Sequence, residues 1–112
     1  MTKVGRFITD PKAGAYCQID LDSGTKILVN HEKGGPRGGR LTVTEKKWFG
    51  GETFLDLQLD SAAGQAALSR LTAGAPEGSA RATPLGALVE ALKDCQSADD
   101  VRARCASLGA AA

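Results

Sequence analysis

The residues best suited to bind another molecule form a basic segment between positions 33 and 47. Five side chains in this segment are cationic and Glu45 is its one acid, so the local charge is five minus one, or +4. The cations are Lys33, Arg37, Arg40, Lys46 and Lys47. The run G-G-P-R-G-G-R at positions 34–40 surrounds the arginines with glycines. This backbone freedom would let guanidinium groups follow an irregular phosphate chain, so the segment favours an anionic partner.

Aromatic residues follow the basic segment directly. Trp48 and Phe49 precede two glycines at a predicted turn, and Tyr16 and Phe54 are expected on outward faces of strands. Rings beside cations are typical of surfaces that bind single strands, because bases stack on the rings while phosphates contact the cations. We therefore expect a non-catalytic binding module for single-stranded nucleic acid or RNA. The expected contact residues are Lys33, Arg37, Arg40, Lys46, Lys47 and Trp48.

Two other interpretations stay open. The basic segment can be a surface loop with solvated charges, beside a Trp48–Phe49 pair that is buried as core. The protein can also be a protein-interaction or regulatory adaptor that uses Tyr16 and Phe54 on a sheet face or the free edge of the first strand. A C-terminal helical hairpin is a further candidate for this role, and it would then mediate self-association.

The glycine-rich run does not predict a nucleoside triphosphatase. Its two outer glycines have the spacing of a phosphate-binding loop, but Arg40 stands where that loop has lysine. Leu41 replaces the serine or threonine that would hold magnesium, and a strand rather than a helix is expected next.

The sequence offers little for catalysis. Nucleophilic and general-base mechanisms need convergent polar groups, and the chain has one histidine, His31, and three widely spaced cysteines, Cys17, Cys95 and Cys105. Their spacing fits no common zinc motif, and Cys17 is expected in the core. We therefore expect neither an enzyme nor a bound metal or cofactor. The one route left to catalysis is a pocket that draws on Asp20, Asp22, His31 and Cys17.

Residues 1–60 are predicted to form a β-meander of five strands. Positions 16–22 and 53–59 alternate apolar and polar residues, which is typical of strands with one buried face. Short turns at Ser23-Gly24 and at residues 48–51, and the glycine-rich loop, join the strands in an antiparallel order. This predicts a five-stranded antiparallel sheet or a small barrel that resembles SH3-like and OB-like modules in topology only.

About three helices are expected after the meander. Asp60 or Ser61 can cap a helix over residues 61–72, and Gly74 ends it. Residues 73–83 have the composition of a flexible connection. Thr83-Pro84 then begins a helical hairpin over residues 84–108, whose second helix starts near Ser97.

Length and composition predict a single domain, residues 1–112, and the order of strands followed by helices predicts an α+β fold. The sequence has 112 residues, of which 42% are hydrophobic and 24% charged, with a net charge of +1. These values are typical of globular domains and exclude a strong overall field. The first residues resemble neither a signal peptide nor a membrane span, and three cysteines favour a reducing compartment. We therefore expect a cytoplasmic protein with no membrane partner.

Overall fold

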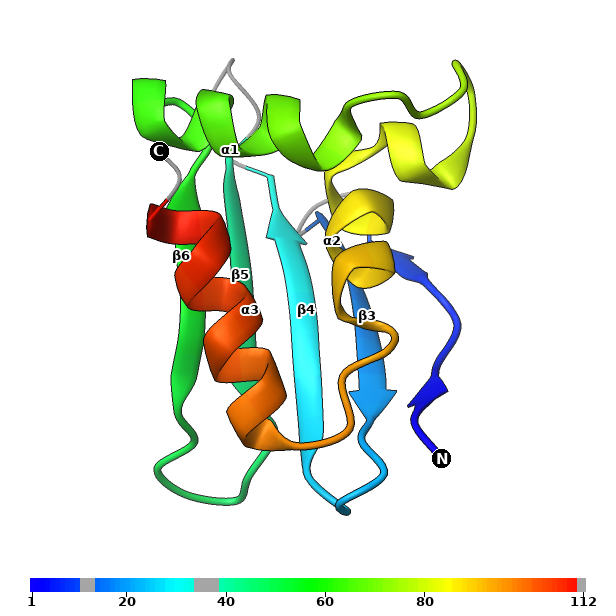
Figure 1. Ribbon diagram of the computed structural model, residues 1–112, viewed down its shortest axis with the longest axis vertical. Coiled ribbons are helices and arrows are strands. Elements are labelled where there is room, and N and C mark those ends of the chain that lie inside the picture. Colours follow the sequence, from blue (N-terminus) through cyan, green and yellow to red (C-terminus); the bar gives the residue numbers. More distant parts are fainter. Residues whose placement is uncertain (11–13, 34–38, 111–112) are drawn as a thin grey trace.

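The computed structural model describes residues 1–10, 14–33 and 39–110, with side chains through Leu108. One layer is an antiparallel sheet, and the helices of the C-terminal half cover one of its faces (Figure 1). This confirms the α+β prediction. The strands are β1 (Lys3–Val4), β2 (Ile8–Asp10), β3 (Gly14–Asp20), β4 (Lys26–Glu32), β5 (Arg40–Glu45) and β6 (Thr53–Gln58).

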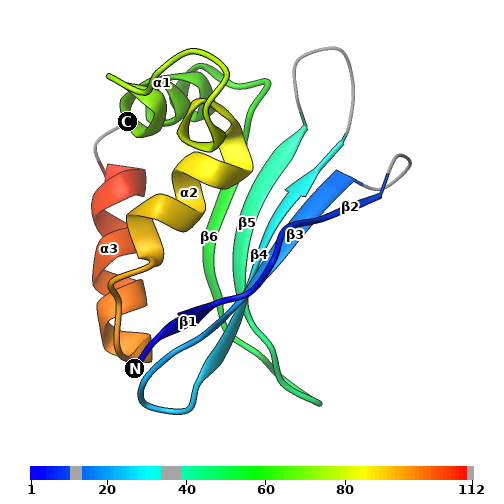
Figure 2. The same cartoon turned by 90° about the vertical axis from the view of Figure 1, so that its right-hand side faces the viewer.

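The sheet is open, so the barrel alternative is wrong. Its strand order is β1-β3-β4-β5-β6, and β2 also pairs with β3. Closure is unnecessary because the helical layer already buries the apolar face of the sheet. Figure 2 shows the helices on one side of the sheet and the other face uncovered.

The first predicted strand, expected over residues 4–9, is divided into two, so the described residues form six strands where five were expected. Both pieces lie antiparallel to β3, with Lys3 opposite Asp20 in β1 and Ile8 opposite Tyr16 in β2. Between them the Gly5 amide donates to the Gln18 carbonyl at 2.8 Å. The N-terminal strands therefore lie beside the polar residues of β3.

The predicted alternation of apolar and polar residues identifies the strand residues that form the core. Cys17 and Ile19 of β3 are fully buried, as are Ile27 and Val29 of β4. The sheet contributes these core residues: Cys17, Ile19, Leu21, Ile27, Val29, Leu41, Val43, Leu55, Leu57 and Leu59. The opposite side chains of β3, β4 and β5 face away from the helices because successive residues of a strand point to opposite faces.

The helices begin where the capping residues predict. The helices are α1 (Ala62–Thr72), α2 (Pro84–Leu92) and α3 (Ala98–Ala110). Ser61 Oγ accepts from the Gly64 amide at 3.0 Å, and Thr83 Oγ1 accepts from the Gly86 amide at 3.1 Å. Each cap satisfies a first-turn donor that has no partner within its helix.

The connection between α1 and α2 has more structure than its composition predicts. A short 3₁₀ helix, η1 (Ala80–Ala82), packs against the start of α2. A Cβ atom at Gly86 would lie 1.9 Å from the Ala80 carbonyl oxygen, so only glycine permits this approach.

The last two helices pack on the sheet and do not leave a free apolar hairpin. Leu88 and Leu92 of α2 and Val101 of α3 are fully buried. In Figure 1, α2 lies over the β3 and β4 side of the sheet, and α3 lies over β6. Their apolar stripes are therefore used by the core. None of the described helices combines the length and apolar character needed to span a bilayer.

Candidate nucleic-acid interface

The structure places the five described members of the predicted contact set in two groups at opposite ends of β5. Lys33 follows β4 and Arg40 begins β5, whereas Lys46 and Lys47 follow the end of β5. A strand rises about 3.3 Å per residue, so Arg40 and Lys46, six residues apart across β5, lie about 20 Å from each other along the strand. Arg37 lies outside the described residues. The basic segment therefore does not form one continuous patch within the described part of the chain.

Arg40 is already paired with acids. Its Nε donates to Asp56 Oδ1 at 2.7 Å and its Nη2 donates to Asp56 Oδ2 at 2.5 Å. Glu32 adds a longer ion pair of 3.9 Å. This bidentate contact raises the pKa of Arg40 and lowers the pKa of Asp56. Arg40 thus links β5 to β6, and its charge is largely balanced within the sheet.

The two lysines after β5 have different environments. Lys47 forms an ion pair of 3.4 Å with Glu45. Lys46 Nζ instead donates to the neutral Gln18 Oε1 at 2.7 Å. Because an amide does not cancel the ammonium charge, Lys46 is held in place with its full charge available.

Trp48 and Phe49 are exposed, so the interpretation of this pair as core is wrong. Their side chains are 89% and 82% exposed. The rings touch each other edge to face, with centroids 5.8 Å apart and an interplanar angle of 84°. Figure 2 shows the β5–β6 hairpin curving away from the helical layer, toward the uncovered side of the sheet. The hairpin therefore presents two aromatic rings to solvent.

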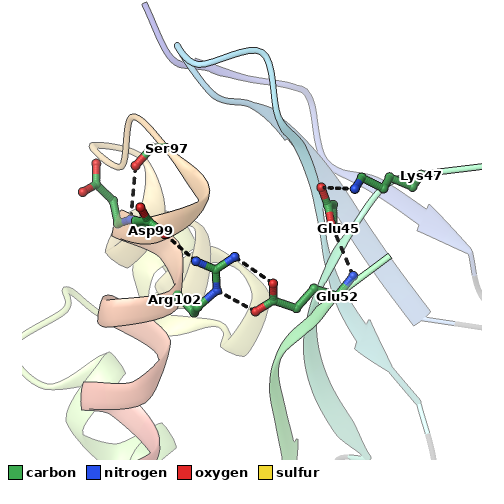
Figure 3. Close-up of polar contacts among 7 residues, drawn as sticks. Glu45, Lys47, Glu52, Ser97, Asp99 and Arg102 are labelled. Carbon is green, nitrogen blue, oxygen red and sulfur yellow. Dashed lines mark hydrogen bonds and ion pairs between the residues drawn. The ribbon is translucent and has the colours of Figure 1, made fainter. Parts of the chain in front are cut away.

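The base of this hairpin is tied to helix α3 by charged residues (Figure 3). Arg102 of α3 donates from Nε to Glu52 Oε2 and from Nη2 to Glu52 Oε1, both at 2.8 Å. Arg102 also pairs with Asp99. Across the hairpin, Glu45 Oε1 accepts from the Glu52 amide at 3.4 Å. These contacts fix the backbone from which the aromatic tip extends.

A β-bulge beside this network turns Phe54 toward the helices. Val43 pairs with Leu55 and Thr44 pairs with Thr53, which leaves Phe54 as the extra residue. Its ring packs against the core cluster, and the Arg102 guanidinium lies 5.7 Å from the ring centroid. The prediction of an outward Phe54 is therefore wrong, because a bulge breaks the two-residue period of the strand.

A groove of about 410 Å³ lies on the uncovered face, between the N-terminal strands and β3. Lys3, Arg6 and Lys46 supply its cations. Tyr16 lines the groove with its ring 37% exposed, which agrees with its predicted outward position. Figure 2 shows β1 and β2 along the edge of the sheet beside β3.

The groove carries a net positive charge. Lys3 and Arg6 form no ion pair with any residue that the structure describes. Among the described residues, Asp20 is the one acid that lines the groove, and its Oδ1 accepts from Gln18 Nε2 at 2.8 Å. Three cations and one carboxylate give a local charge of three minus one, or +2. Gln18 positions both Asp20 and Lys46 through the two ends of its amide.

Sequence reasoning missed Lys3 and Arg6 as site residues. Lys46 lies 40 positions beyond Arg6 in the chain, and only the pairing of β1 and β2 with β3 brings them into one groove. The alternating pattern of residues 16–22 signals that the Tyr16, Gln18 and Asp20 face is polar. It does not reveal which strand lies beside that face.

The thiols are shielded from solvent beneath this face, and Cys17 Sγ donates to the carbonyl oxygen of Gly5 at 3.3 Å. Cys17, Cys95 and Cys105 are buried and free. Burial raises the pKa of Cys105 to about 12, so this thiol stays protonated at neutral pH. Within residues 1–10, 14–33 and 39–110, no three His, Cys, Asp or Glu side chains gather as a metal-binding group.

No family model matches this sequence, and neither a curated protein nor a solved structure resembles the chain.

Proposed function

We propose that the protein binds single-stranded nucleic acid or RNA on the uncovered face of its sheet. The supporting observation is the groove in which Lys3, Arg6 and Lys46 lie together and form no ion pair with an acid among the described residues. Lys46 also begins the hairpin that exposes Trp48 two residues later. A cationic channel and aromatic platforms therefore adjoin each other.

The cations would hold the phosphate backbone. Ammonium and guanidinium groups bind phosphate oxygens through charge-assisted hydrogen bonds and release the counterions that a nucleic acid carries in solution. Lys46 is preorganised for this contact because Gln18 fixes its Nζ in the groove. Fewer rotamers are then lost when a phosphate binds.

The rings would hold the bases. Trp48 and Phe49 are open to solvent at the hairpin tip, and Tyr16 lines the groove. A ring stacks on the face of an unpaired base, whereas a duplex hides these faces within its own stack. This favours a single strand over a duplex.

The test is a titration at low salt of labelled single-stranded RNA and DNA oligonucleotides against matched duplexes. Trp48 is the sole tryptophan, so its fluorescence reports directly on stacking. We expect quenching by the single strands and loss of affinity in Arg6→Ala and Lys46→Ala. Lys93→Ala serves as the control, because Lys93 pairs with Glu90 on the helical layer. Absence of binding to every oligonucleotide would refute the proposal.

A protein-binding adaptor is the second candidate, and the exposed Trp48–Phe49 pair favours it. Large exposed aromatic side chains are common anchors of protein interfaces. An interface of this kind would be insensitive to salt and to Lys46→Ala, but it would be lost in Trp48→Ala. Light scattering after size exclusion tests the self-associating form of this candidate.

A further inference from the structure

A second concave site lies in the helical layer, away from the open face of the sheet. It occupies about 380 Å³ where α1, η1, α2 and α3 meet. Figure 1 shows α1 crossing one end of this layer above α2 and α3. The groove on the sheet and this depression share no residue. The depression therefore belongs to a different part of the surface.

The floor of the depression is apolar. Leu71 of α1 and Leu108 of α3 are half-buried there, on either side of two alanines of α2. Ala87 and Ala91 are four residues apart on α2, so they share one helix face. Their small side chains leave space that a larger residue would fill.

Two arginines lie at the rim of this apolar floor. Arg81 of η1 has no ion pair or hydrogen bond from its side chain to any residue that the structure describes. Arg70 of α1 makes one long hydrogen bond, from Nη2 to the Leu108 carbonyl oxygen at 3.5 Å. Both guanidinium groups therefore retain donors for a ligand.

Glu90 is the one acid at the rim within the described part of the chain, and it does not balance these charges. Glu90 Oε1 forms an ion pair of 2.6 Å with Lys93. Arg70 and Arg81 thus give the rim a net positive charge above an apolar floor. An anionic head on a short apolar tail complements both features, and a planar carboxylate matches the guanidinium fork.

We propose that this depression binds a small amphipathic carboxylate, with its head between Arg70 and Arg81 and its tail over Ala87 and Ala91. The volume of about 380 Å³ suits a ligand of modest size. The head replaces water around two guanidinium groups that form no ion pair with a described acid, and the tail covers apolar surface.

Octanoate, octanol and octylammonium are suitable probes because they share a tail and differ in the head. Isothermal titration calorimetry should detect octanoate binding that is at least about tenfold tighter than octanol binding, because charge-assisted hydrogen bonds are lost with the alcohol. Octylammonium should not bind. Equal affinity for octanoate and octanol, or no octanoate binding at low salt, would overturn the proposal.

Variants separate the head and tail contacts. Arg70→Gln with Arg81→Gln should abolish the preference for octanoate over octanol, since both changes remove the positive charge. Ala91→Leu should block all binding by filling the floor, and circular dichroism verifies that the variant is folded. Arg6→Ala on the sheet groove is the matched control and should bind octanoate normally. Octanoate affinity that is unchanged in the double glutamine variant would contradict this assignment.

Discussion

Arg102 and Glu52 are 50 positions apart in the sequence, and their side chains meet in a bidentate ion pair. The pair joins helix α3 to the end of the hairpin that carries Trp48. Its contact lowers the pKa of Glu52 and raises that of Arg102. A residue of the helical layer thus positions an aromatic tip that lies toward the opposite side of the sheet.

Replacing Arg102 should loosen this hairpin. In Arg102→Met the Glu52 carboxylate loses its partner, so the pKa of Glu52 should rise toward its ordinary value of 4.5. A pH titration of the Glu52 carboxyl carbon by NMR measures this change. Lys93→Met is the control, because its ion pair with Glu90 is remote from the hairpin. A Glu52 titration that is identical in wild type and Arg102→Met would contradict the structural pairing.

Acid should destabilise the protein by protonating the carboxylates of Asp56 and Glu52. Arg40 holds the pKa of Asp56 below its ordinary value, and Arg102 does so for Glu52. A carboxyl whose pKa is lowered by folding contributes stability above its unfolded pKa and loses it as the pH falls through its folded pKa. Urea denaturation midpoints should therefore fall once the pH drops below about 4. The double variant Arg40→Gln/Asp56→Asn should show a smaller fall over this range.

The buried thiols predict that the protein loses stability at alkaline pH. Burial raises the pKa of Cys105 to about 12 and also raises those of Cys17 and Cys95 from 9.0. Above pH 9 the unfolded thiols ionise while the thiol of folded Cys105 stays protonated, so the folded state loses stability relative to the unfolded state as the pH rises. Native protein at pH 8 should react with a thiol reagent only as fast as it unfolds. Rapid labelling of folded protein would contradict this burial.

The packing of α2 on the sheet predicts that shortening one of its buried side chains strongly reduces the free energy of unfolding. Leu88 is fully buried between the helical layer and the strands. Leu88→Ala should reduce the free energy of unfolding by about 2–5 kcal/mol, because it removes apolar contacts and leaves a cavity. Ser69→Ala on the exposed surface of α1 is the control and should change stability by less than about 0.5 kcal/mol. Equal urea midpoints for the two variants would be inconsistent with this core.

If Trp48 stacks on bases, the affinity for a single-stranded oligonucleotide should depend on whether the residue at this position has an aromatic ring. Trp48→Ala should weaken binding of a single-stranded oligonucleotide by about 5- to 150-fold, whereas Trp48→Phe should retain most of the affinity. Fluorescence anisotropy of a labelled oligonucleotide measures both variants. If alanine and phenylalanine at this position weaken binding equally, stacking is not the role of this residue.

The sequence contains enough local information to predict most elements of this fold. Alternation at residues 16–22 and 53–59 identifies buried faces, and Ser61 and Thr83 mark helix starts through hydrogen bonds with nearby residues. The division of the first strand was not predictable in this way. It depends on how Gly5 pairs with Gln18, which is a contact between distant segments.

The candidate site was less predictable because it depends on register and on ion pairing. A count of charges between residues 33 and 47 cannot tell that Arg40 of β5 pairs with Asp56 of the neighbouring strand β6, or that Lys46 reaches Gln18. Exposure of Trp48 was also ambiguous, since a lone tryptophan in a small domain is commonly buried.

The salt dependence of oligonucleotide binding tests the proposed groove most directly. Each neutralised phosphate of a single strand contributes a slope of about −0.7 to a plot of log affinity against log salt, so contacts by Lys3, Arg6 and Lys46 predict a slope of about −2. The triple variant with alanine at these positions should bring the slope close to zero, whereas Arg40→Gln/Asp56→Asn should leave it unchanged. A triple variant that keeps the wild-type slope would contradict a phosphate path through this groove.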